Sequence, residues 1–220
     1  EVCGVTILTN QIVITTLRCA NSYQEAPASY RVRFGVQAIG QYDQYTQHLT
    51  VGAVYTTEQE LDVERHIAVF KMIGHIQFTK YVQPICLWPR YKIPPKAGYL
   101  VSYGKYRFGD QPQANTMQIV SKRDCVQDNE NFARSYIDSL TFCAGSRNED
   151  GLNVADLGSG LFVRRGNNWF LRGLMIAAVI EGPMKTDNVM FLDVTHFSDW
   201  ISAKLSPKSP NQKLDFSSIM

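Results

Sequence analysis

One stretch of the sequence alternates apolar and polar residues with the period of a β-strand. Tyr30, Val32, Phe34 and Val36 lie on one side of this alternation, and arginine and glycine lie between them. Because successive side chains of a strand point to opposite faces, the pattern predicts a strand with one buried face and one face in water. Similar short runs, separated by glycine, proline, asparagine and aspartate, occur at 5–8, 12–16, 49–55, 67–70, 100–103, 117–120, 161–163, 170–179 and 189–194. Many short strands of this kind indicate a sandwich or a barrel.

Helical periodicity is confined to two segments. The first runs from Arg123 to about Arg134, and the second lies near the end of the chain, where apolar residues have the spacing i, i+3, i+4 and i+8. We expect the second helix to dock one apolar face on the body of the protein; its apolar residues are Phe197, Trp200, Ile201 and Leu205. Residues 206–220 are polar and broken by proline, which predicts a flexible tail after a single domain at 1–205.

The composition is that of a folded protein with no strong electrostatic preference. Of the 220 residues, 45% are hydrophobic and 19% are charged, and the formal net charge is +2. Such a weak charge does not favour nucleic acid or an anionic membrane as a partner. No apolar run approaches the roughly 20 residues of a membrane-spanning helix. We therefore expect neither nucleic acid nor a membrane as partner.

Five cysteines occur in the chain, at Cys3, Cys19, Cys86, Cys125 and Cys143. An odd number leaves one thiol free or paired outside the chain. No Cys-x-x-Cys pair is present, so a zinc ribbon has no support. The first residues lack the basic start and apolar core of a secretory leader, which leaves open a cytosolic chain and a mature or partial product of a longer protein.

Six local patterns, taken in order, carry a family resemblance. They are Cys-Gly-Val-Thr-Ile-Leu at 3–8 with Val-Ile-Thr-Thr-Leu-Arg-Cys at 13–19, His-Ile-Ala-Val-Phe-Lys at 66–71, Gln-Pro-Ile-Cys-Leu at 83–87, Phe-Cys-Ala-Gly at 142–145, Asp-Leu-Gly-Ser-Gly-Leu at 156–161 and the closing helix sequence at 194–201. In this order they resemble the chymotrypsin-like (trypsin) family of serine proteases. The resemblance covers nearly everything from Cys3 to Leu205.

The resemblance implies an all-β fold of two packed six-stranded antiparallel β-barrels, a C-terminal α-helix and a cleft between the barrels. The strand-rich pattern agrees with this fold independently. The given sequence starts where family members have already completed their first barrel strand, so the first barrel is expected to be truncated at its N-terminal end.

The resemblance also places the three catalytic positions of the family, and none of them keeps its catalytic residue. Acyl transfer needs a hydroxyl nucleophile, an imidazole that takes its proton and a carboxylate that orients the imidazole. Arg18 stands at the histidine position, His66 at the aspartate position and Leu157 at the serine position. A guanidinium stays protonated near neutral pH, and leucine has no heteroatom. Loss of the whole unit costs on the order of 10⁶ in kcat, so the resemblance implies no catalytic residue here.

The specificity pocket of the family is also substituted in this sequence. Gly151 stands at the floor position where trypsin-like members carry aspartate, and Val189 replaces a glycine of the pocket wall. Ala155 replaces the glycine of the oxyanion hole, the group of amides that stabilises the developing negative charge. Asp156 matches the aspartate that receives the new N-terminal amine in active members. We expect a filled or remodelled pocket.

The matched cysteines imply two internal disulfides and one external one. The resemblance pairs Cys3 with Cys19 and Cys125 with Cys143. Cys86 matches the cysteine that bonds to an upstream segment or domain. Together with the resemblance, the disulfides imply a secreted, extracellular protein.

These features predict a catalytically inactive serine protease homologue that acts by binding. It is similar to the non-catalytic homologues of arthropods, which serve as cofactors or decoys in protease cascades of immunity, clotting or development. The expected partner is a protease, a zymogen or an inhibitor. No cofactor is expected, and no metal site, because His48, His75 and His196 lack metal-like spacing.

Two other interpretations of the sequence stay open. The chain could be a serine hydrolase with a rebuilt site around His66 and Ser159, or a truncated fragment that does not fold alone. An aromatic binding surface of Tyr42, Tyr45 and Tyr55 is a further alternative, although a mixture of barrel packing and loop exposure is the better prediction for these rings.

Overall fold

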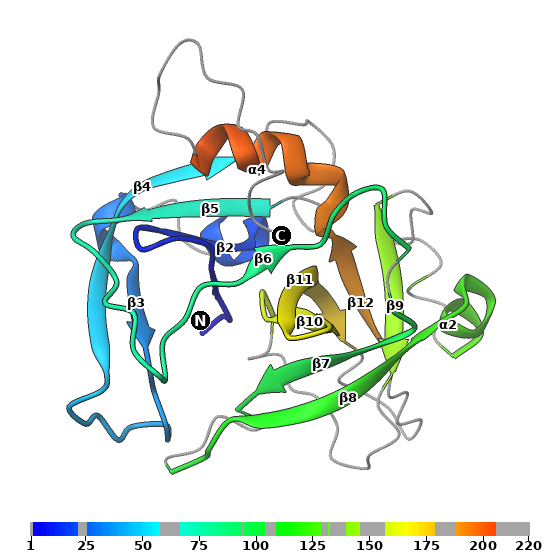
Figure 1. Ribbon diagram of the computed structural model, residues 1–220, viewed down its shortest axis with the longest axis horizontal. Helices are drawn as coiled ribbons and strands as arrows, with labels where there is room; N and C mark the ends of the chain where they lie inside the picture. Colours follow the sequence, from blue (N-terminus) through cyan, green and yellow to red (C-terminus); the bar gives the residue numbers. More distant parts are fainter. Residues whose placement is uncertain are drawn as a thin grey trace.

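The strands of the protein form two sheets side by side, and a helix ends the described chain (Figure 1). The predicted mostly β architecture with a C-terminal helix is confirmed. The computed structural model describes residues 2–21, 26–57, 67–93, 95–103, 109–128, 132, 140–145, 157–178 and 188–205.

The first sheet has five antiparallel strands and is open. Its strand order is β1-β2-β5-β4-β3, so β1 and β3 are the edges. The truncated first barrel that the sequence predicts is present as this half-barrel. Its strands are β1 (Thr6–Ile7), β2 (Ile12–Thr16), β3 (Arg31–Phe34), β4 (Gln47–Thr56) and β5 (Ile67–Met72).

Strand β3 has the alternation that the sequence predicts. Arg31 and Arg33 are exposed, whereas Val32 and Phe34 are buried. The strand ends sooner than the alternation of the sequence does. Gly35 takes a positive φ of 70°, a backbone conformation that glycine adopts without a steric penalty, and the chain turns there.

Strands β2 and β5 are buried on both faces, unlike β3. In β2, Val13 packs within the core of the first sheet, whereas Ile12 and Ile14 pack in a cluster with residues of the second sheet. In β5, Ile67 and Val69 belong to the same shared cluster. The two sheets are therefore joined by a common apolar core, which we call the shared core.

The second sheet closes on itself. Six antiparallel strands follow the order β10-β7-β8-β9-β12-β11, and β11 pairs with β10 to complete the ring. A short additional strand, β6, lies parallel to β11. The strands are β6 (Cys86–Leu87), β7 (Ala97–Ser102), β8 (Gln113–Val120), β9 (Thr141–Gly145), β10 (Gly160–Arg165), β11 (Asn168–Ala178) and β12 (Asn188–Asp193). This closed barrel is the second of the two barrels that the sequence predicts.

Two strands of the second sheet were not predicted from the sequence. Strand β9 is buried at every position, so it has no alternation of apolar and polar residues. Strand β6 has only two residues, which is too short for any period to be detected. Strand β2 is equally buried but has a run of β-branched residues, which β9 lacks, and this difference explains why β2 was predicted and β9 was missed.

The helices are short, and the last one docks on the shared core. Ile201 is fully buried in that core, and Phe197, Trp200 and Leu205 pack against it, as predicted. The elements are α1 (Leu17–Asn21), η1 (Pro27–Ser29), α2 (Lys122–Asp128), η4 (Val194–Phe197) and α4 (Ser198–Leu205). The predicted tail at 206–220 and the end of the helix predicted from Arg123 lie outside the described residues, apart from Phe132. No helix among the described residues has the length and apolarity to cross a membrane.

Candidate functional site at the junction of the two sheets

The two sheets meet where the chain enters β10, around Leu157 and Gly158. The Gly4 amide donates a hydrogen bond of 2.7 Å to the Leu157 carbonyl oxygen, and the Gly158 amide donates one of 2.9 Å to Met175. Gly158 has a φ of 79°, and an added β-carbon there would lie 2.3 Å from Thr15 Oγ1. Only glycine fits this contact without strain.

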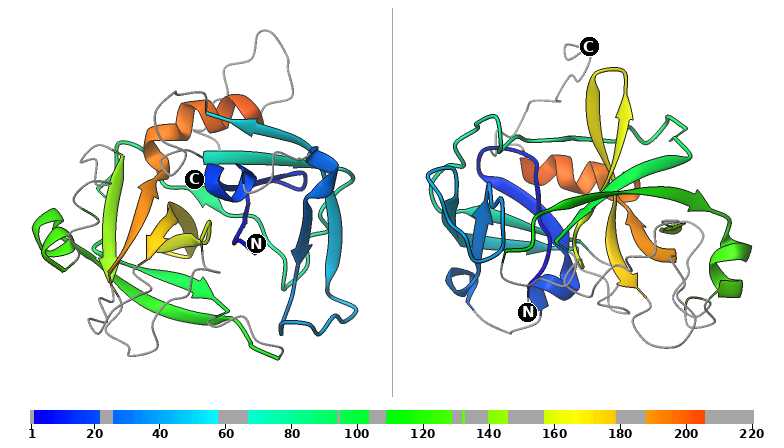
Figure 2. Two further views of the ribbon diagram at one scale, coloured as in Figure 1. Left: turned by 180° about the vertical axis from the view of Figure 1, so that it is seen from behind. Right: turned by 90° about the horizontal axis from the view of Figure 1, so that it is seen from below.

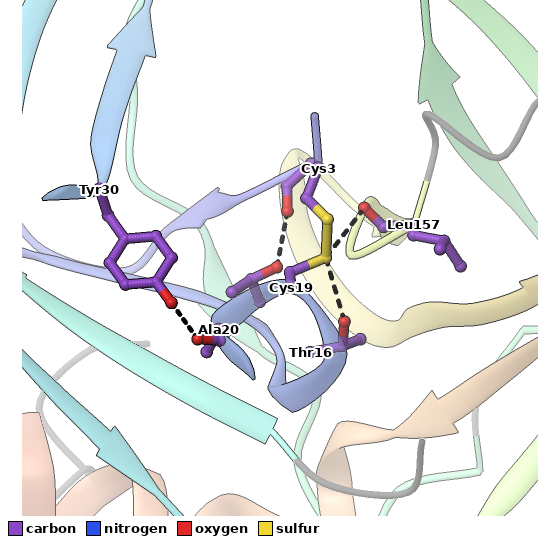
Figure 3. The surroundings of a disulfide bond; sticks show 8 residues. Cys3, Thr16, Cys19, Ala20, Tyr30 and Leu157 are labelled. Carbon is purple, nitrogen blue, oxygen red and sulfur yellow. Dashed lines mark hydrogen bonds between the residues drawn. A yellow bond between two sulfur atoms is a disulfide. The ribbon is translucent and has the colours of Figure 1, made fainter. Parts of the chain in front are cut away.

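The disulfide between Cys3 and Cys19 lies at the same junction (Figure 3). It ties the segment before β1 to helix α1, with 6.0 Å between the two Cα atoms. The Thr16 hydroxyl donates a hydrogen bond of 3.3 Å to Cys19 Sγ, which lies 3.7 Å from the Leu157 carbonyl oxygen. The Tyr30 hydroxyl donates to the Ala20 carbonyl oxygen and so links β3 to α1. Helix α1 and the Leu157 segment are therefore held together across the two sheets.

Two of the three residues predicted to stand at catalytic positions are described, and they lie in different environments. Arg18 is exposed on α1, whereas Leu157 is buried, with 3% of its surface accessible. His66, the third position, lies outside the described residues. The structure thus places Arg18 and Leu157 on neighbouring segments joined through Cys19, with one side chain in solvent and the other in the protein interior.

Of the predicted pocket residues, Val189 is the one that the structure describes. It lies in β12 opposite Ala144 of β9, and 2% of its surface is accessible. Its side chain belongs to the core of the second barrel. The other members of that core are Leu100, Met117, Phe142, Ala144, Leu161, Met175 and Phe191. Gly151, Ala155 and Asp156 lie outside the described residues.

Ser159, the alternative nucleophile, points its hydroxyl into the junction. A β-carbon added to Gly4 would lie 2.2 Å from Ser159 Oγ, so the hydroxyl packs against the Gly4 backbone. The Ser159 carbonyl oxygen accepts a hydrogen bond of 2.9 Å from the Met175 amide. Gly4 precedes β1 of the first sheet and Met175 lies in β11 of the second, so Ser159 is placed as part of the contact between the two sheets.

The two internal disulfides that the resemblance implies are present. Cys3 is bonded to Cys19, and Cys125 is bonded to Cys143. The second bond is fully buried and joins α2 to β9. Cys86 is free and exposed on β6.

A buried ion pair near the closing helix had no signal in the sequence. Arg172 of β11 pairs with Asp193 at the end of β12, and the guanidinium lies 4.8 Å from the ring centre of Phe142. The Asp193 carboxylate also accepts a hydrogen bond of 3.0 Å from the Thr195 amide, which caps η4. Two charged residues 21 positions apart become neighbours only because their strands pair, so no local pattern predicts this contact.

The tyrosines and histidines that the sequence analysis considered do not converge on one site. Tyr42 contacts His48, Tyr45 contacts Tyr81, and Tyr55 packs against the shared core. His75 is exposed, and His196 Nε2 lies 3.9 Å from the Asp193 carboxylate. In the part of the chain that the structure describes, no three His, Cys, Asp or Glu residues are grouped to hold a metal ion.

A closed barrel, a half-barrel packed against it and a short C-terminal helix define the chymotrypsin-like class of serine protease folds. The family model described as Trypsin matches residues 1–201. This chain belongs to the trypsin family.

Three curated relatives are similar to the chain along most of its length. They are "Serine protease gd" of Drosophila melanogaster (24% identical, over 91% of this chain and 47% of the relative), "Transmembrane protease serine 11G" of Mus musculus (24%, 94% and 50%) and "Testisin" of Homo sapiens (21%, 96% and 73%). The chain spans about half the length of the first two relatives.

Proposed function

We propose that this trypsin-family chain is a non-catalytic homologue that binds a protein partner instead of cleaving it. The observation that carries the proposal is Leu157, which matches the nucleophile position in the sequence and is buried at 3% accessibility. An aliphatic side chain offers neither an attacking oxygen nor a proton to transfer. The position therefore contributes packing rather than chemistry.

The other matched positions support the same proposal. Arg18 is exposed on α1 and cannot act as a base near neutral pH, because a guanidinium keeps its proton. His66 completes the set at the aspartate position, where an imidazole would not supply the buried negative charge that orients a catalytic histidine.

The degenerate pocket is the second part of the proposal. Val189 fills space within the second barrel where the family resemblance places a glycine of the pocket wall. Together with Gly151 at the floor position and Ala155 at the oxyanion hole, this substitution supports a filled or remodelled pocket. Binding by this chain would then use surfaces outside the ancestral cleft.

We further propose that the protein is extracellular and is a cofactor or decoy in a protease cascade, with a protease, a zymogen or an inhibitor as partner. Two disulfides favour an oxidising compartment. Similarity to the Drosophila "Serine protease gd" supports a role connected with proteolysis. The exposed Cys86 is available for a disulfide to an upstream segment, with 1–205 as the family domain and 206–220 as its tail.

Covalent labelling with a fluorophosphonate tests the proposal. Such probes phosphonylate an activated serine, so we expect no adduct on this protein under conditions that label active trypsin completely. The matched variant is Ser159→Ala, which removes the alternative nucleophile. A stoichiometric adduct on the unmodified sequence that disappears in Ser159→Ala would show a rebuilt hydrolase and overturn the proposal.

Two further measurements test the binding and disulfide parts. A screen against purified extracellular proteases, zymogens and inhibitors should find a saturable complex, and only non-specific contacts would count against a binding role. Peptide mass spectrometry without reduction, on protein from its natural source, should find Cys86 bonded to an upstream peptide. A free Cys86 would contradict that link.

A further inference from the structure

The outer face of the closed barrel carries large apolar side chains that the barrel does not bury. Tyr99 and Val101 lie on β7 and are 40% and 38% exposed, and Trp169 at the start of β11 is 43% exposed. Exposed and buried residues alternate along β7, and Leu100, between Tyr99 and Val101, points inward and is fully buried. The exposed face is therefore the regular outer face of the sheet and not a local distortion.

Tyr99, Trp169 and Arg164 form one group of contacting side chains, and Val101 and Arg165 are exposed near it. The rings of Tyr99 and Trp169 meet edge to face with 5.5 Å between their centres. Arg164 lies opposite Trp169 in the β10–β11 ladder, and its guanidinium lies 5.9 Å from the centre of the indole ring. Arg165 follows at the tip of the hairpin, where it pairs with Asn168, so its exposed side chain lies on the opposite face of the ladder from Arg164 and Trp169. We call Tyr99, Val101, Arg164, Arg165 and Trp169 the hairpin patch.

The hairpin that carries most of this patch projects from the barrel. The right-hand view of Figure 2 shows the β10–β11 hairpin extending beyond the neighbouring strands. Gly166 makes the turn with a φ of 59°, and its carbonyl oxygen accepts a hydrogen bond of 3.0 Å from Arg164 Nε. No atom lies within 4 Å of a β-carbon placed on Gly166, so the tip is open to a partner. A preorganised hairpin loses little conformational entropy on binding.

The charge of the hairpin patch is not compensated within the described part of the chain. Arg172, in the same barrel, is paired with Asp193, and Arg90 is paired with Asp199. Arg164 and Arg165 form no ion pair with a described residue. Tryptophan, tyrosine and arginine are the residues that contribute most to the affinity of protein interfaces, and here they are adjacent. Two uncompensated guanidinium groups favour carboxylates on the opposing surface.

We propose that the hairpin patch is the docking surface for a protein partner that presents acidic side chains next to an apolar one. The apolar side chain would pack against Tyr99 and Trp169, and the partner's carboxylates would pair with Arg164 and, around the tip of the hairpin, with Arg165. This inference rests on the proposed function, because it assigns a surface to the binding role. It places that surface on the second barrel, away from the catalytic positions.

Selection from a phage-displayed random peptide library tests the inference, with the folded protein as bait and the selected peptides then synthesised as probes. We expect the peptides to be enriched in Asp and Glu beside Leu, Ile or Phe. Trp169→Ala should weaken their binding about tenfold or more, as at an interface hot spot. The double variant Arg164→Glu/Arg165→Glu should weaken it to a similar extent and reduce its dependence on salt.

Matched variants control for general effects of these changes. Tyr91→Ala removes a tyrosine that is 94% exposed on another loop, and Lys71→Glu/Arg123→Glu reverses two exposed charges elsewhere. Both controls should bind the peptides within about twofold of the parent protein, a difference of less than 0.5 kcal/mol on the scale of about 1.4 kcal/mol per tenfold change. Peptides without acidic enrichment, or acidic peptides that bind the patch variants as tightly as the parent, would overturn the inference. The fluorophosphonate result does not depend on either outcome, so a failure of the patch and a failure of the proposed function are distinguishable.

Discussion

The first sheet and the second sheet solve the problem of unpaired strand edges in different ways. The second sheet pairs β10 with β11 and has no edge within its six-stranded ring, whereas the first ends at β1 and β3. Closure satisfies the backbone groups of every strand within the sheet. The first sheet is not closed in this way, and it is held against the second sheet by the shared core beneath β2 and β5 and by the junction around Leu157. Substitutions should therefore have different effects in the two sheets.

The largest contrast is expected between two buried phenylalanines. Phe191 is fully buried inside the closed barrel and stacks on Phe142, so Phe191→Ala should lower the free energy of unfolding by about 4 kcal/mol. Phe34 ends the edge strand β3, where neighbours can relax into the space, so Phe34→Ala should cost about 3 kcal/mol. Urea unfolding measures both changes. An equal or larger cost at Phe34 would contradict the difference between the two sheets.

Removing each disulfide in turn distinguishes an effect on the free energy of unfolding from an effect on the structure of the junction. They close loops of similar size, with sequence separations of 16 and 18, so replacing either pair with alanine should cost about 3 kcal/mol. Only the loss of Cys3–Cys19 should speed hydrogen exchange at the Gly4 amide, which donates to Leu157. Equal exchange at Gly4 in both double variants would remove the junction role that we assign to the first disulfide.

Two glycines with positive φ provide the next comparison. Gly158→Ala would place a β-carbon against Thr15 and the Gly4 carbonyl at the junction, and we expect a loss of about 3 kcal/mol from strain and overlap together. Gly166→Ala would strain the backbone at a positive φ, but its β-carbon would overlap no other atom, so the free energy of unfolding should fall by only about 1 kcal/mol. Thermal unfolding of both variants checks the difference. Similar costs would mean that the junction is loosely packed.

The smallest effect is expected where the closing helix touches the first sheet. Lys204 Nζ lies 5.1 Å from the ring centre of Tyr55 in β4 and 5.5 Å from that of Trp200. Lys204→Met keeps the length of the side chain and removes the charge, which should cost about 0.5 kcal/mol in chemical denaturation. Lys80→Met, beside the exposed Tyr81, is the matched control and should have a smaller effect. A larger effect in the control would contradict a bridging role for Lys204.

The parts of the fold that the sequence predicts are those whose contacts are local. Alternation found β3, and the run at 12–16 coincides with β2. Strand β9 was missed because Thr-Phe-Cys-Ala-Gly lacks the run of β-branched residues that marks the equally buried β2. The closure of the second barrel depends on pairing between distant strands, and only the family resemblance predicted it.

In the candidate site, too, features encoded by local motifs could be predicted, whereas contacts between distant segments could not. The substituted positions Arg18 and Leu157 could be named from matched motifs, because those motifs are continuous in sequence. The packing of Ser159 against Gly4 and the contact between Tyr99 and Trp169 could not, since each joins segments that only the folded chain brings together. Physical contacts between strands leave no trace in local spacing.

The central claim is that the chain binds without cleaving, and a direct search for cleavage tests it best. The purified protein would be incubated with a diverse synthetic peptide library, and new peptide ends would be identified by mass spectrometry, with active trypsin as the positive control. The account predicts no cleavage products above the buffer background, because Leu157 supplies no nucleophile. Specific cleavage by the parent protein that is abolished in Ser159→Ala would contradict it.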